Sequence, residues 1–379
     1  MARPPGRPAP SRTAFFAAGA AFVLPLLAGL LLPAAAARGQ SVVLTPAQTA
    51  KLRELVKADA EAARHFDKLR RRADAALADA PDPIANIETQ GKLKTDPAKV
   101  RTGESLKDMA KLEALGYAYA VTGEAKYAEK ARAFVLAWAK ANKPDGDPID
   151  ETNLDDLIVA YDLTRATFGA ADREAVEKYL GKLADAELET ARKKKDNGHN
   201  NWHSHRLKIL GLVAYATADK KLIAHVAAEY REQVDKNLRP DGSSFDFHER
   251  DALHYHLYDV KPLLALAVAA RNNGTDLYGH KSADGASLGK SVAFVVPYAE
   301  GKKTHAEFVH SKVAFDKKRA ESGDKHYEAG HPFDPKSAGS TLALAEAFDP
   351  TLLPLVTKLT KPDAKRFPTW ETVLNAARR

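Results

Sequence analysis

Apolar residues recur at helical spacing along most of this chain. The i, i+3, i+4, i+7 pattern is clearest in four segments, which run from Ala131 to Trp138, Leu154 to Tyr161, Val176 to Leu183 and Ile223 to Tyr230. Each segment places its apolar side chains on one face of a helix, as an amphipathic helix packed against a core requires. The pattern therefore predicts an all-α chain.

Short turn signals separate these helices. Thr122-Gly123, Phe168-Gly169 and Pro240-Asp241-Gly242 lie between apolar segments, and such Gly and Pro residues mark the ends of helices. The alternation predicts a succession of antiparallel helical hairpins. Because no segment repeats at a fixed period, a barrel-like toroid of helix pairs is favoured over a regular solenoid.

Two segments are less regular. An alanine-rich first helix is expected over residues 46–80, ending at Pro81-Asp82-Pro83. Residues 291–296 are the best strand candidate, inside a glycine-rich, basic stretch at 274–303 that we expect to be a loop or a small β-hairpin. No linker divides the chain after residue 37, so residues 38–379 are expected to form a single domain.

The first 37 residues have the three parts of a secretory signal. Residues 1–12 are basic without an acid, residues 13–32 are largely apolar, and residues 34–37 offer a cleavage site of small side chains. A signal anchor is the alternative, since an apolar run of about twenty residues can span a bilayer. Pro25 and the alanine-rich exit favour cleavage, so we expect a periplasmic or secreted protein with no membrane contact after signal removal.

Charge and cysteine content exclude two classes of protein. Removing residues 1–37 takes away three arginines and lowers the net charge from +7 to +4. This mild excess attracts a polyanion but is far below that of proteins that track nucleic-acid phosphates. The chain has no cysteine, so it is not a disulfide-stapled protein, and its stability must come from a large apolar core.

The polar chemistry is concentrated in residues 198–206 (GHNNWHSHR) and 247–258 (FHERDALHYHLY). Together they hold six of the thirteen histidines, with side-chain amides, arginines and tyrosines. Such groups can bind a carboxylate and move a proton beside it. The two stretches therefore point to an enzyme that acts on an acidic substrate.

A metal site is the main competing interpretation. His203 and His205, with His254 and His256, could supply four imidazoles to zinc or copper. Side chains two residues apart diverge on a helix, however, and both stretches lead into helical patterns. We therefore predict no catalytic metal and no cofactor, with a structural ion left open.

These stretches resemble the alginate lyase family, the mannuronate-specific polysaccharide lyases built as an incomplete α/α toroid. The resemblance covers most of residues 88–264, including Gly91-Lys92-Leu93 and residues 150–163. The family has Asn-Asn-His-Ser, then Ala-Leu-x-Tyr-His-x-Tyr with an arginine upstream, and residues 200–204 and 252–258 are similar. Here Trp202 separates the amides from the histidine, and His248 stands where the family's arginine is expected. These departures fit a related polysaccharide lyase family on the same scaffold.

The resemblance implies β-elimination at a uronic acid. Asn201 and His203, with Arg250 nearby, would neutralise the carboxylate, and Tyr255 would take the C5 proton and return it to the leaving oxygen. A neighbouring cation favours the phenolate that such a base needs. His203 as base with Tyr255 as acid is the arrangement for anti elimination. On a helix, Asn200 and His203, or Asn201 and His205, would also share a face.

Further residues are predicted to bind substrate: Lys92, Asn200, Trp202, His205, Arg206, His248 and His256. Four of the residues predicted for catalysis or binding have a structural alternative. Tyr255 could be an ordinary buried phenol, and Arg250 could pair with Glu249 or Asp251. Trp202 could belong to the core, and Lys92 could be a solvated surface lysine.

The sequence thus predicts a lyase for a β-1,4-linked uronate polymer, with polymannuronate or alginate first and glucuronan second. A glycoside hydrolase is the second enzyme class, because Glu151, Asp155, Asp246 and Glu249 could supply its two carboxylates. A non-catalytic periplasmic glycan-binding protein is the third. The oligomeric state is not readable from the sequence.

Overall fold

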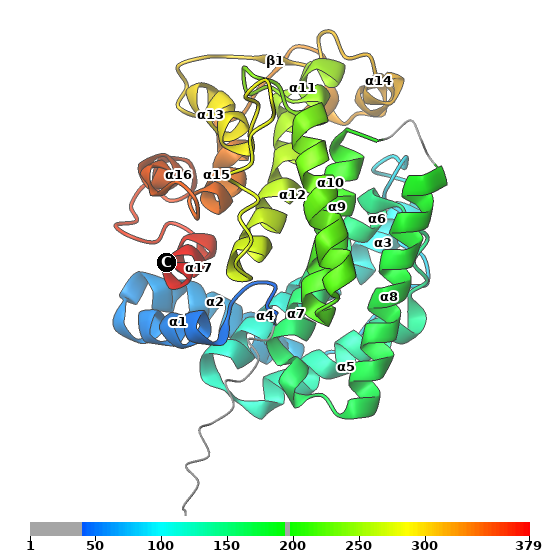
Figure 1. Ribbon diagram of the computed structural model, residues 1–379, viewed down its shortest axis with the longest axis vertical. Helices are drawn as coiled ribbons and strands as arrows, with labels where there is room; N and C mark the ends of the chain where they lie inside the picture. Colours follow the sequence, from blue (N-terminus) through cyan, green and yellow to red (C-terminus); the bar gives the residue numbers. More distant parts are fainter. Residues whose placement is uncertain (1–39, 194–197) are drawn as a thin grey trace, which may run out of the picture. The chain divides into compact units, whose positions relative to one another are not determined.

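Helix α9 (Asn201–Thr217) is buried along almost its whole length. It belongs to a computed structural model that describes residues 40–193 and 198–379 (Figure 1). The helix begins at Asn200, whose side chain accepts a hydrogen bond from the backbone N–H of Trp202 at 3.1 Å, as an N-cap residue does. The first predicted polar stretch therefore forms the start of a central helix.

Helices make up most of the described chain. The α-helices are α1 (Pro46–Ala58), α2 (Ala60–Ala76), α3 (Pro97–Ser105), α4 (Lys107–Thr122), α5 (Ala125–Ala141), α6 (Pro148–Glu151), α7 (Asp155–Thr164), α8 (Ala170–Lys193), α9, α10 (Lys220–Asn237), α11 (Phe245–Arg250), α12 (Leu253–Asn272), α13 (Leu288–Ala299), α14 (Ala314–Glu321), α15 (Gly339–Ala345), α16 (Leu353–Thr360) and α17 (Trp370–Arg378). The 3₁₀ helices are η1 (Thr152–Leu154), η2 (Arg165–Thr167), η4 (Lys325–Tyr327), η5 (Pro335–Ala338) and η6 (Pro350–Leu352).

The helices form a circuit around one core. Helices α2, α4, α7, α9, α12 and α15 each pack against the next, while α5, α8 and α10 lie outside α7 and α9. The C-terminal helix α17 packs against α1 and α2, so red and blue ribbons meet in Figure 1. The all-α toroid predicted from the hydrophobic pattern is confirmed.

The strand prediction for residues 291–296 is wrong. These residues lie in α13, which Ser287 caps by accepting the backbone N–H of Lys290 at 3.3 Å. Val292, Val295 and Ala299 are buried there at i, i+3 and i+7, so packing on one helical face prevails over the strand preference of a valine-rich run. The described residues do contain a small antiparallel pair, β1 (Ala306–Glu307) with β2 (His331–Pro332).

The predicted first helix over residues 46–80 is two helices. Asp59 ends α1 in an extended conformation and then caps α2, accepting the backbone N–H groups of Glu61 and Ala62 at 2.8 and 3.1 Å. The predicted signal at residues 1–37 lies outside the described residues. Within the described ranges, no helix combines the length and apolar character that crossing a bilayer requires.

Helices α9 and α12 approach closely at Gly211. A Cβ atom built on Gly211 would lie 2.2 Å from Leu266 Cδ1 on α12, far inside van der Waals contact. Nearby, the Ser204 hydroxyl donates to Asp259 Oδ1 at 2.6 Å. The two polar stretches start these two helices, so their packing sets how the stretches face each other.

We expect Gly211→Ala to destabilise the protein by about 1–3 kcal/mol, because the methyl group forces Leu266 or the helices apart. Urea unfolding measures the loss. The matched control is Gly181→Ala on α8, where nothing lies within 4 Å of the added methyl; alanine's higher helix propensity should make that variant slightly more stable. Equal stabilities for both variants would contradict the close approach.

Candidate active site

Tyr255 lies in the first turn of α12, and a distant residue fixes that turn. Ala252 precedes the helix and has no side chain that can cap it. The carboxylate of Glu307 on β1 caps it instead, accepting the backbone N–H groups of Leu253 at 2.9 Å and His254 at 3.0 Å. Tyr255 is therefore held on a helix start that is anchored from outside the helix.

The phenol of Tyr255 lies between two guanidinium groups. Arg319 on α14 donates a hydrogen bond from Nη1 to the phenolic oxygen at 2.7 Å. The guanidinium carbon of Arg250 lies 3.9 Å from the centre of the ring. Arg319 therefore places a charged hydrogen-bond donor at the oxygen through which this side chain would exchange a proton.

Aromatic rings complete the surroundings of Tyr255. The centres of the Tyr258, Phe308 and Tyr327 rings lie 6.0, 6.1 and 6.5 Å from that of Tyr255. Phe308 has a φ of +63°, a left-handed conformation that is costly for a bulky side chain. Its backbone N–H donates to the carbonyl of Asp251 at 2.7 Å, so the hydrogen bond holds this strained residue beside the phenol.

The amide of Asn201 is fixed by a buried carboxylate. Asp246 accepts the backbone N–H of Asn201 at 2.7 Å and a second hydrogen bond from its side-chain Nδ2. Burial raises the pKa of Asp246 to about 6, although both hydrogen bonds from Asn201 act against the shift. Asn201 therefore cannot rotate freely, as a preorganised donor requires.

The two polar stretches meet at one cavity. It measures about 390 Å³, and we call it the amide cavity; its lining includes Asn200, Asn201, Trp202, Asp246 and Arg250. Arg250 also contacts the Tyr255 ring, so it links the amides to the phenol. Four of the predicted site residues thus line one cavity, namely Asn200, Asn201, Trp202 and Arg250, and Tyr255 is joined to them through Arg250.

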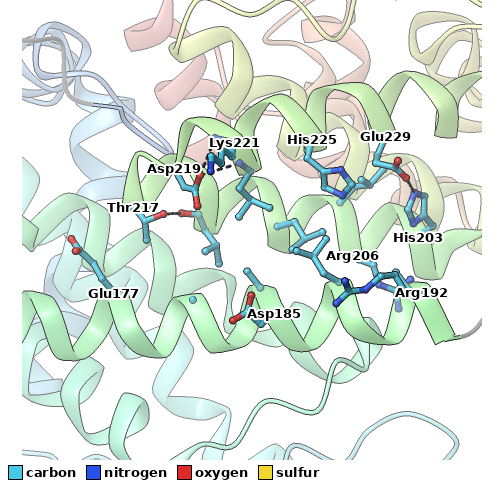
Figure 2. Close-up of a pocket in the computed structure, with 18 residues that line it drawn as sticks. Glu177, Asp185, Arg192, His203, Arg206, Thr217, Asp219, Lys221, His225 and Glu229 are labelled. Atoms are coloured by element: carbon cyan, nitrogen blue, oxygen red, sulfur yellow. Dashed lines mark hydrogen bonds and ion pairs between the residues drawn. The ribbon is translucent and has the colours of Figure 1, made fainter.

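His203 lies elsewhere, and the predicted partnership of Asn201 and His203 is not formed. Its Nε2 lies 3.6 Å from Glu229 Oε2 on α10. It lines a different, larger cavity of about 780 Å³ between α8, α9 and α10, which we call the outer cavity (Figure 2). Within the described part of the chain, His203 makes no hydrogen bond, ion pair or ring contact with Tyr255.

Helix geometry explains this difference. Residues two apart on a helix point about 200° from each other, so His203 and His205 occupy opposite faces of α9. His205 faces α12, where its ring centre lies 4.3 Å from that of Tyr258. The alternative pair of Asn201 and His205, four residues apart, is the one whose members share this face.

The network around His205 fixes its protonation. Lys208 donates to Thr152 Oγ1 at 2.6 Å, so the Thr152 hydroxyl is free to donate to Nδ1 of His205 at 2.7 Å. Burial lowers the pKa of His205 well below its ordinary value, and the neutral ring then carries its proton on Nε2. That nitrogen is buried without a hydrogen-bond partner among the described residues. The contact between the His205 ring and the Tyr258 ring helps to join α9 to α12.

Four other predicted substrate-binding residues have structural partners. Arg206 is buried and its Nε lies 2.9 Å from Glu187 Oε2. His256 is fully buried, with its two ring nitrogens bonded to Ser244 and to the carbonyl of Ser291. Both ring nitrogens of His256 are thus engaged inside the protein, whereas Arg206 also lines the outer cavity. The substrate-binding roles predicted for these two residues stay predictions. His248 bonds to Ser243 at 2.8 Å, and Lys92 pairs with Glu88 at 3.3 Å.

The carboxylates considered for a hydrolase are also engaged. Glu151 accepts two backbone N–H groups, Asp155 pairs with Lys208, and Glu249 lies 3.5 Å from Lys312. With Asp246 bonded to Asn201, each of the four candidates has a partner of its own. In the part of the chain that the structure describes, no cluster of His, Asp and Glu is arranged to hold a metal ion.

The comparisons with known proteins agree with this geometry. The family model for alginate lyase matches residues 52–305. The chain belongs to the alginate lyase family. It is accordingly a polysaccharide lyase, and the enzyme class predicted from the two polar stretches is confirmed.

Solved structures share the fold of this lyase at low sequence identity. An alginate lyase from Bacteroides ovatus has a TM-score of 0.65 at 18% identity, covering 89% of this chain and 99% of that one. Alginate lyase A1-III from Sphingomonas species A1 has a TM-score of 0.57 at 20% identity, covering 82% and 90%. Its histidine-to-alanine variant, complexed with tetrasaccharide, has a TM-score of 0.58 at 20% identity, covering 82% and 89%. A comparison with curated proteins finds no significant match.

Sequence reasoning missed the side chains that surround Tyr255 from the C-terminal part of the lyase. Glu307, Phe308, Asp316, Arg319 and Tyr327 follow residue 305, where the family match ends. They occur in no motif, and α14 looks like an ordinary charged surface helix. Only the tertiary structure, in which the segment after residue 305 packs against the start of α12, shows that these side chains surround Tyr255.

For the lyase we expect His203→Ala to lower kcat/KM by less than about fivefold, or about 1 kcal/mol, because His203 faces the outer cavity. The comparison variant is Asn201→Ala on the same helix, which removes the fixed amide and should cost at least about tenfold. Steady-state kinetics measure both. A loss for His203→Ala that equals or exceeds that for Asn201→Ala would place the histidine back in the site.

A buried acid pair should make stability depend on pH. Burial raises the pKa of Glu151, and the neighbouring Glu187 raises it further. The folded state then holds a proton that the unfolded chain releases in the ordinary carboxyl range, so stability falls as pH rises above that range. Glu151→Gln keeps the acceptor oxygen and removes the titration.

We therefore expect the melting temperature of Glu151→Gln, relative to the wild type, to rise between about pH 5 and about pH 8. Glu129→Gln on α5 is the control, because Glu129 is exposed and its removal should leave the pH dependence unchanged. A constant difference between Glu151→Gln and wild type would show that Glu151 ionises normally in the folded protein.

Proposed function

We propose that this lyase cleaves a β-1,4-linked uronate polymer, polymannuronate or alginate, by β-elimination. The observation that carries the proposal is the hydrogen bond from Arg319 to the phenolic oxygen of Tyr255, with Arg250 over the same ring. The alginate lyases that share the fold, one of them with bound tetrasaccharide, support a polysaccharide substrate.

Tyr255 acts as base and then as acid. Its phenolate takes the proton from C5 of the uronate; the C4–O bond breaks, a C4=C5 double bond forms, and the phenol returns the proton to the leaving oxygen. One group can perform both transfers only when the proton and the leaving oxygen lie on the same face of the sugar ring, which is the case for mannuronate and glucuronate. Such proton transfer contributes on the order of 10²–10⁴ in rate.

The carboxylate at C5 must be neutralised before its neighbouring proton can leave. Arg319 is suited to this task because its guanidinium already lies 2.7 Å from the phenolic oxygen, and C5 and its carboxylate are directly bonded. A guanidinium can serve two acceptors through its fork of N–H groups. The amide of Asn201, held by Asp246, supplies a further donor from the other polar stretch.

The mild positive charge of the chain without residues 1–37 suits an anionic polymer. If residues 1–37 direct export, the enzyme meets that polymer in the periplasm or outside the cell. Every proton movement in this mechanism uses a side chain of the protein itself. No cofactor is needed to balance the reaction.

We expect Tyr255→Phe to lower the rate of unsaturated-product formation on polymannuronate by at least about 100-fold, with little change in melting temperature. Ultraviolet absorbance of the new double bond measures the rate. Tyr230→Phe is the matched control: the Tyr230 hydroxyl is buried without a hydrogen-bond partner, so its removal should preserve activity.

The same assay decides the substrate. Polymannuronate, glucuronan, polyguluronate and hyaluronan are compared at equal uronate concentration, with reducing ends counted in parallel. We expect absorbance to rise with polymannuronate first. New reducing ends without absorbance would indicate a hydrolase, and binding without any fall in chain length would indicate a glycan-binding protein. Full activity of Tyr255→Phe would contradict the role of the phenol for any substrate.

A further inference from the structure

Asp316 lies at the centre of a charged cluster beside Tyr255. Its side chain is only 1% exposed. One carboxylate oxygen accepts a hydrogen bond from Arg250 and lies 3.6 Å from Nη1 of Arg319. The other accepts the Ser311 hydroxyl at 2.7 Å. A single buried carboxylate therefore serves two guanidinium groups.

The two arginines reach different parts of the phenol. Arg319 bonds to its oxygen, whereas Arg250 lies over its ring. The two arginines come from α14 and α11, which are far apart in the sequence. Both guanidinium groups contact the same phenol, so without a shared anion their like charges would repel each other. Asp316 is the group that allows both to approach Tyr255 at once.

We propose that Asp316 is a positioning residue that holds Arg250 against the ring and Arg319 against the oxygen of Tyr255 while cancelling one of their two positive charges. The proposal rests on the proposed role of Tyr255 as base. One net positive charge favours the phenolate, but two would make it a weaker base for the C5 proton. Arg250 is bonded directly to Asp316, which leaves Arg319 as the arginine for the substrate carboxylate.

Other ionisable groups face Tyr255 and must be considered: His254 and Tyr258 on α12, Glu307 on β1 and Tyr327 on η4. Low polarity around the His254 ring lowers its pKa to about 4. Burial raises the pKa values of Tyr258 and Tyr327 above the ordinary value for tyrosine. These three side chains are uncharged near neutral pH. Glu307 is bound to two backbone N–H groups at the start of α12.

This arrangement belongs to the C-terminal part of the chain. Asp316 and Arg319 both follow residue 305, the last residue of the family match. Helix α14 supplies both side chains of the cluster.

The test is a titration of Tyr255 without substrate. The ultraviolet signal of phenolate is recorded for each protein and for the same protein carrying Tyr255→Phe, and the difference isolates one of the twelve tyrosines. Asp316→Asn keeps the size of the side chain but removes its charge. We expect the Tyr255 titration to move to lower pH by about one unit, and the rising limb of the kcat/KM profile to move with it.

Two variants provide controls. Glu321→Gln removes a carboxylate from the exposed side of the same helix, where Glu321 lies 3.8 Å from Lys317, and should not move the titration. Asp316→Asn combined with Arg250→Met removes one negative and one positive charge. This double variant should return the titration to the wild-type value. It also serves if the single variant does not fold, because Arg250 no longer has to be buried without its directly bonded carboxylate.

A titration that stays in place or moves to higher pH in Asp316→Asn overturns the proposal, as does a double variant that fails to restore it. Melting temperatures are measured alongside, since a merely structural role would lower them without moving the titration. The titration needs no polymer. A failure to cleave any uronate polymer would therefore refute the proposed function and leave this result interpretable.

Discussion

The site depends on the cap that one carboxylate places on α12. Ala252 cannot cap the helix, and the first backbone N–H groups of α12 bond instead to Glu307, more than fifty residues later. A helix start without such partners would leave buried donors unsatisfied. The cap therefore holds Tyr255 in place, and it also brings the segment after β1 against the phenol. Phe308, Asp316 and Arg319 belong to this segment.

A second constraint is the packing of α9 against α12. Gly211 allows the close approach, and the hydrogen bond from Ser204 to Asp259 fixes the register. Burial raises the pKa of Asp259 well above its ordinary value, because a charged carboxylate is costly in this buried interface. This packing decides which face of α9 meets the phenol, and consequently which of its polar residues line the amide cavity.

The position of Trp202 between Asn201 and His203 has a physical consequence. Residues two apart on a helix point about 200° from each other. His203 faces Glu229 and the outer cavity, while Asn201 lies beside Asp246 and lines the amide cavity with Arg250. Arginines near Tyr255 come from α11 and α14, and one of them follows the end of the family match. At 18–20% identity the fold is retained, whereas the side chains around the phenol come partly from outside the matched segment.

The sequence by itself determined the helices, their hairpin order and the enzyme class, because an apolar stripe at helical spacing and two dense polar motifs are local properties of the chain. It also identified Asn201, Arg250 and Tyr255 as candidate catalytic residues, and their roles stay predictions. It misread residues 291–296, where tertiary packing selects a helix from a valine-rich run. Only the tertiary structure decided that His203 and His205 face opposite ways, that Arg206 and His256 are engaged in the interior, and that Asp316 and Arg319 reach Tyr255. Those outcomes depend on contacts between segments far apart in the chain, and no periodicity or short motif encodes such contacts.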